Sequence, residues 1–65
     1  MQTKEMLRER CDVMLVAILG SKLHAETWWH VANKAFAGMT PEGQWILNPN
    51  TVYNYLVAHH SGDYQ

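Results

Sequence analysis

The chain has 65 residues, a net charge of −1 and a single cysteine, Cys11. A chain this short forms one domain at most, and it buries only about 60% of the surface that it exposes when unfolded. Disulfides, metals or partner chains usually supplement so small a core. An internal disulfide is excluded, and a lone thiol favours a reducing compartment, so we expect a cytoplasmic protein.

The high apolar content, 48% of residues, favours a homo-oligomer or a complex with a protein partner. No membrane partner is expected. The longest apolar run, VMLVAIL, covers residues 13–19, whereas a bilayer crossing needs ~20 residues. It is followed by GSKLH, which is not typical of a signal-peptide cleavage site.

The fold class predicted is all-α: a small bundle of about four helices, two long and two short, that forms a single helical interaction domain over residues 1–65. The first helix covers residues 4–19, and Gly20 ends it because glycine adopts the left-handed conformation at little cost. Its apolar residues recur at spacings of three and four and form one stripe: Leu7, Cys11, Met14, Leu15 and Ile18. Arg8 and Asp12 are expected to face away from this stripe.

The second helix is predicted over residues 22–36, with Ser21 as its cap and Gly38 beyond its end. Thr40 and Pro41 then predict the start of a short helix that ends near residue 47, because threonine caps helices and proline suits their first position.

A fourth helix is predicted to begin at Pro49 and to end before Gly62. Its inward residues are expected to be Val52, Tyr53 and Leu56, and Tyr55 and His59 are further candidates.

Neither catalysis nor metal binding is indicated. The histidines lie six apart or adjacent, whereas zinc-binding helices favour spacings of three or four: His24, His30, His59 and His60. Cys11 belongs to the apolar stripe and has no base beside it on the helix. There is no glycine-rich phosphate loop. We therefore expect no enzyme, no cofactor and no metal.

A helix-turn-helix regulator is an alternative, because PNTVYNYL is similar to the start of a recognition helix. The charge distribution argues against it. All five basic residues lie within the first 34 positions, and contacts from Lys and Arg to phosphate dominate affinity for DNA. We expect no specific binding of nucleic acid.

From about Met14 onward the chain resembles the toxin-binding domain of Xre/MbcA/ParS-type antitoxins, the partners of RES-type toxins that consume NAD. The matching positions span roughly 50 residues: Gly20, Ser21, Ala25, Trp28, Asn33, Phe36, Gly38, Thr40, Pro41, Val52, Leu56, Gly62, Asp63 and Tyr64. The chain departs from the family at Trp29, where leucine is usual, at Ala32, where proline is usual, and in PEGQWIL, which replaces a leucine-rich helix.

The resemblance implies an antitoxin-like inhibitor that binds and blocks a partner protein, in a stand-alone form without the usual DNA-binding domain. A phage or mobile-element protein that uses the same domain to inhibit a host protein is the alternative.

Two sets of residues are predicted to contact the partner. Trp28 is expected to fill the core, which leaves Trp29 and Trp45 either at the interface or half-buried on a monomer. The second set rests on the resemblance, which implies that the C-terminal tail reaches the toxin's NAD pocket: His59, His60, Gly62, Asp63, Tyr64 and Gln65. The alternative for the tail is a frayed end without a role.

Overall fold

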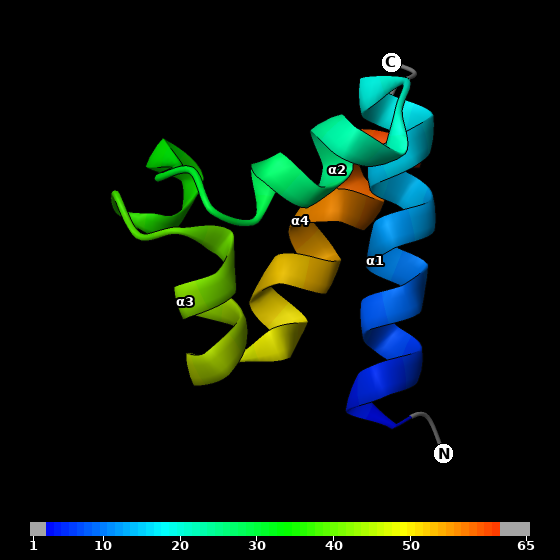
Figure 1. Cartoon of the computed structure of the whole chain (residues 1–65). Coiled ribbons are helices and arrows are strands. Elements are labelled where there is room, and N and C mark those ends of the chain that lie inside the picture. The colour runs from blue at the N-terminus through cyan, green and yellow to red at the C-terminus, as the bar shows by residue number, and fades with distance from the viewer. Residues whose placement is uncertain (1–2, 62–65) are drawn as a thin grey trace.

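A computed structural model describes residues 3–61, which form α-helices and one 3₁₀ turn and contain no strand (Figure 1). The prediction of an all-α fold with four α-helices is therefore confirmed. The elements are α1 (Lys4–Leu19), α2 (Lys22–Trp28), the 3₁₀ turn η1 (Lys34–Phe36), α3 (Pro41–Leu47) and α4 (Pro49–Ser61).

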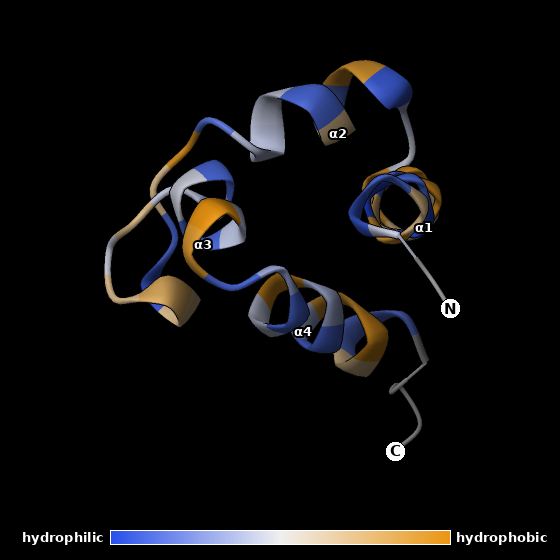
Figure 2. Cartoon of the chain, turned by 90° about the horizontal axis from the view of Figure 1, so that it is seen from below, coloured by the Kyte–Doolittle hydropathy of each residue, from blue (hydrophilic) through white to orange (hydrophobic). Residues whose placement is uncertain are grey.

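The longest helix, α1, packs against both α2 and α4, and α3 packs against α4. Seen nearly along α1, the four helices surround one shared interior (Figure 2). Every α-helix contributes to this interior, and so do η1 and the turn after α2. The buried apolar side chains are Cys11, Leu15, Ala25, Trp29, Phe36, Trp45, Val52 and Leu56.

Hydroxyl side chains cap the first three α-helices. The side-chain oxygens of Thr3, Ser21 and Thr40 accept hydrogen bonds from the backbone N–H three residues on, at 3.1, 3.1 and 3.0 Å. Such caps satisfy backbone donors that the helix itself leaves unpaired. Gly20 ends α1 with φ 89°, and its N–H donates to the carbonyl of Val16. The caps and stops expected at Ser21, Thr40 and Gly20 are therefore confirmed.

The second helix ends earlier than expected. It stops at Trp28 instead of continuing to residue 36, so that prediction is wrong. In a continuous helix Phe36 would lie ~12 Å along the axis from Trp28. The loop instead returns Phe36 to a ring-centroid distance of 6.2 Å from Trp28. The chain therefore reverses after α2, because packing Phe36 into the core stabilises the fold more than the hydrogen bonds of a longer helix would.

Asn33 holds this reversal closed. Its backbone N–H donates to the carbonyl of Met39, and its own carbonyl accepts from Gly38, at 3.0 and 3.1 Å. Its side-chain oxygen accepts from the N–H of Ala35 at 2.9 Å. Asn33 thus pairs both ends of the loop that delivers Phe36 to the core.

Ala37 carries local backbone strain, since it has φ 57° and ψ 34° at the end of η1. The left-handed conformation costs a non-glycine residue about 1–2 kcal/mol. We expect Ala37→Gly to raise the free energy of unfolding by roughly 0.5–1 kcal/mol, because relief of this strain exceeds the extra chain entropy of glycine. Urea unfolding followed by circular dichroism measures the change.

Ala35→Gly is the matched control, since Ala35 lies in the same turn without a positive φ. It should lower stability. A shift of both variants in the same direction would contradict the assignment of strain to Ala37.

Candidate functional site

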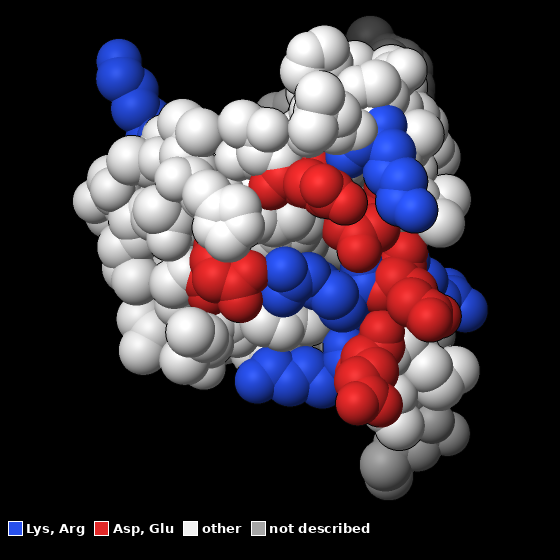
Figure 3. Space-filling view, viewed as in Figure 1, with Lys and Arg blue, Asp and Glu red and all other residues white. Residues whose placement is uncertain are grey.

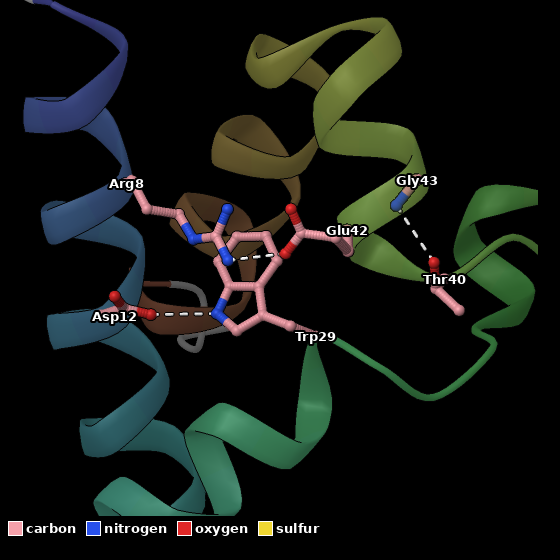
Figure 4. A network of polar contacts seen from close by, with 6 residues as sticks. All are labelled: Arg8, Asp12, Trp29, Thr40, Glu42 and Gly43. Carbon is pink, nitrogen blue, oxygen red and sulfur yellow. Dashed lines mark hydrogen bonds and ion pairs between the residues drawn. The ribbon is translucent and has the colours of Figure 1, made fainter.

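The strongest polar cluster of the described chain joins α1 to α3 around the indole of Trp29 (Figure 4). The guanidinium of Arg8 lies 3.6 Å from the centroid of the Trp29 ring and 5.4 Å from that of Trp45. One of its nitrogens also forms an ion pair with the carboxylate of Glu42, at 2.7 Å. A guanidinium suits this place because it is planar and weakly hydrated, and can stack on a ring while bonding a carboxylate.

Trp29 is held by two further hydrogen bonds. Its indole N–H donates to the carboxylate of Asp12 on α1, at 2.9 Å. Its backbone carbonyl accepts from the N–H of Glu42 at the start of α3, at 3.1 Å. One residue between α2 and α3 therefore contacts both α1 and α3 through side-chain and backbone groups.

The predicted roles of the tryptophans are wrong. Trp29 and Trp45 are 2% and 4% exposed, whereas Trp28 is only partly buried. Two indoles fit this small core because they pack edge to face, with centroids 5.7 Å apart and planes at 86°. Arg8 covers the faces that would otherwise meet water. Neither Trp29 nor Trp45 can therefore present its ring to a partner without unfolding part of the domain.

A second cluster, on the last turns of α4, is more accessible. Tyr55 lies between Trp28 and His59, with ring-centroid distances of 6.3 and 4.1 Å. The Nδ1–H of His59 donates to the carbonyl of Tyr55 at 3.0 Å, since a carbonyl can only accept. Phe36 closes the inner side of this group, 5.1 Å from Tyr55. Trp28, Tyr55 and His59 are here named the aromatic shelf; His59 is exposed and the other two are partly exposed.

The two adjacent histidines lie on different sides of α4, as expected from their spacing. His60 lines a groove between α1 and α4 with Tyr53 and Met14, away from the aromatic shelf. His59 and His60 are both exposed, but they do not form one site. The other predicted contact residues, Gly62, Asp63, Tyr64 and Gln65, lie outside the described residues.

Two features of the described residues bear on reactivity: the state of the Cys11 thiol and the spacing of the side chains that could bind a metal ion. Cys11 is fully buried, and burial raises the pKa of its thiol to about 11, with a further rise from the charge of Asp12. At neutral pH this thiol stays protonated and acts as a small apolar side chain. Within residues 3–61, no three His, Cys, Asp or Glu side chains lie close enough together to hold a metal ion.

The candidate recognition helix, α4, carries no Lys or Arg within the residues that the structure describes, and only Asn48 separates it from α3. A helix-turn-helix has a turn of three or four residues. Over α1 and its neighbours, acidic and basic side chains are mixed on one face (Figure 3). None of the helices within residues 3–61 has the length and hydropathy of a membrane-crossing segment.

No family model, no curated protein and no solved structure matches the chain. The expectation that Arg8 and Asp12 face away from the apolar stripe is wrong, because both contact the buried Trp29, and their cluster with Glu42 was not predicted. One pattern could have indicated it: Arg8 and Asp12 lie four apart on α1, at the edge of the apolar stripe, where long polar side chains can reach over the core.

The ion pair between Arg8 and Glu42 predicts a loss of stability in acid. The hydrogen bond from Arg8 lowers the pKa of Glu42 below its ordinary value of 4.5. A carboxyl whose pKa is lower in the folded state stabilises the fold above its unfolded pKa, and this contribution is lost as the pH falls through the folded pKa. Glu42→Gln should therefore cost about 0.5–1 kcal/mol at pH 7, as expected for a partly exposed pair, and nothing at pH ~2.

Urea unfolding of both proteins across this pH range measures the difference. Glu26→Gln removes the same charge from an exposed position on α2 and serves as the control. If the two substitutions flatten the pH profile equally, Arg8 and Glu42 do not form a stabilising pair.

Proposed function

We propose that this chain is a small protein-binding module of the cytoplasm, an antitoxin-like inhibitor that binds and blocks a partner protein. The observation that supports the proposal is the aromatic shelf. Trp28 stacks on Tyr55 and the His59 ring lies tilted against Tyr55, yet all three side chains remain at least partly exposed, and His59 lies two residues before the end of the described chain. Tryptophan and tyrosine are enriched in the centres of protein interfaces because they offer large rigid contact area.

The partner class follows from the resemblance to antitoxins of RES-type toxins. Most positions that carry this resemblance have structural roles here, as the cap Ser21, the buried Ala25 and Phe36, and the left-handed Gly38 illustrate. Residues of this kind support a shared scaffold. The proposal adds to this shared scaffold the identity of the partner, a RES-type toxin.

The proposed contact surface differs from the one inferred from sequence. Trp29 and Trp45 are omitted because they are buried, and Trp28 takes their place beside His59. The tail, Gly62 to Gln65, keeps its proposed place in the partner's NAD pocket. Asp63 would offer an anion to a basic pocket, and Tyr64 would offer a ring with a hydroxyl.

A phage or mobile-element inhibitor of a host protein is the second candidate for the same surface. The neighbouring genes separate the two. A RES-type toxin gene beside this one favours the antitoxin, and a phage gene cluster favours the host-directed inhibitor.

Deletion of residues 62–65 tests the tail. The shortened chain should keep its melting temperature, because none of the described core residues is removed. It should lose protection against the toxin encoded by the adjacent reading frame, measured as growth and NAD content during co-expression. Full protection by the shortened chain would exclude the tail and leave the shelf as the contact surface.

His59→Ala tests the shelf. His59 is exposed and contacts the Tyr55 ring, so its loss should leave the fold intact while weakening the complex at least tenfold, about 1.4 kcal/mol, by calorimetry. Asn54→Ala, also exposed on α4, is the matched control and should bind normally. If the unaltered chain neither binds the toxin nor restores growth, the antitoxin proposal is wrong.

A further inference from the structure

His59 is held in one orientation on the aromatic shelf. Its ring centroid lies 4.1 Å from that of Tyr55, and its Nδ1 lies 3.0 Å from the Tyr55 carbonyl oxygen. Because a carbonyl oxygen only accepts, Nδ1 carries a proton, and in the neutral ring Nε2 then has a free lone pair. His59 is exposed, and no donor from residues 3–61 lies on Nε2. The shelf therefore presents a hydrogen-bond acceptor to a partner.

The position of the shelf in the fold favours a positively charged donor. Trp28 is the last residue of α2 and His59 lies in the last turn of α4, so two helices end beside the shelf. The C-terminal end of a helix carries a partial negative charge, because its last carbonyls lack partners within the helix. α4 contains no Asp, Glu, Lys or Arg that would change this charge. The ring faces of Trp28 and Tyr55 also attract cations.

The ionisable side chains on the surrounding elements leave this acceptor free. Lys22 and Glu26 of α2 line the groove between α1 and α2. Tyr53 and His60 line the groove between α1 and α4. No ion pair joins His59 to another residue within the described range, 3–61. The ionisable side chains that remain on α2, η1 and α4 are His24, Lys34 and Tyr55.

We propose that the aromatic shelf binds a lysine or arginine side chain of its protein partner, and that an N–H of this cation donates to Nε2 of neutral His59. This contact rests on the proposed function, because the partner is the protein that occupies the shelf. In acid, His59 gains a proton, so Nε2 becomes a donor and the ring repels the partner's cation. The complex therefore forms near neutral pH and weakens as the pH falls.

Calorimetry with the toxin encoded by the adjacent reading frame tests the contact at about pH 8 and about pH 5.5, where histidine changes its charge. The complex of the unaltered chain should be at least tenfold weaker at the lower pH. His59→Gln keeps an acceptor oxygen near the position of Nε2 but does not titrate, so it should bind and lose most of this pH dependence. His59→Phe keeps a ring without an acceptor and should bind at least tenfold more weakly near pH 8.

His60→Gln and His24→Gln are the matched controls, since both histidines are exposed and neither belongs to the aromatic shelf. Both should keep the affinity and the pH dependence of the unaltered chain, and circular dichroism checks that every form is folded at both pH values. Normal binding by His59→Phe, a complex that tightens in acid, or a flat pH profile in a control would overturn this contact and leave the proposed function standing. A toxin that binds the unaltered chain at neither pH would overturn both.

The tautomer of His59 can be measured without a partner. Long-range proton–nitrogen spectra of the free chain at about pH 8 should show a proton on Nδ1 and none on Nε2, because the Tyr55 carbonyl requires a donor. A ring that carries its proton on Nε2 would present a donor to the partner. That result would overturn the proposed contact, whatever the toxin binds.

Discussion

The fold depends on the contact between the guanidinium of Arg8 and the indole of Trp29. The extensive helix-to-helix contacts join α1 to α2, α1 to α4 and α3 to α4. Between α1 and α3, the ion pair of Arg8 with Glu42 supplies a direct polar link, and Trp29 packs between the two helices. One cation over one ring thus links α1 to Trp29, which follows α2, whereas α1 and α3 share no extensive contact of their own.

This contact also explains how so short a chain buries two indoles. An indole N–H that is buried without a partner would cost free energy, but Asp12 accepts from Trp29. Among the described residues, no buried side-chain nitrogen or oxygen lacks a hydrogen-bond partner. Arg8 and Glu42 stay about one-third exposed, so their charges remain partly hydrated while their carbon atoms cover apolar surface. Arg8 and Glu42 therefore extend the apolar surface that is shielded from water, and they do so without placing a buried, unpaired charge in the core.

Features set by local chemistry could be predicted from the sequence, and features set by tertiary packing could not. The bounds of α1 and α3 and the caps at Ser21 and Thr40 follow from apolar periodicity and from the conformational preferences of threonine, proline and glycine. The end of α2 does not, because residues 29–36 suit a helix until the core requires Phe36 beside Tyr55. The exchange of roles between Trp28 and Trp29 has the same cause, since the chain leaves the helix between them. The sequence alone does not show which of two adjacent tryptophans is buried, because the path of the chain decides which ring enters the core.

The buried and exposed aromatic residues consequently serve different needs. Trp29 and Trp45 cannot change without loss of the core, so they are poorly suited to adjusting affinity for a partner. His59 is exposed and can vary at little cost to the fold. Ligands that bind only the folded state stabilise it by mass action. A partner on the aromatic shelf would therefore stabilise this small domain.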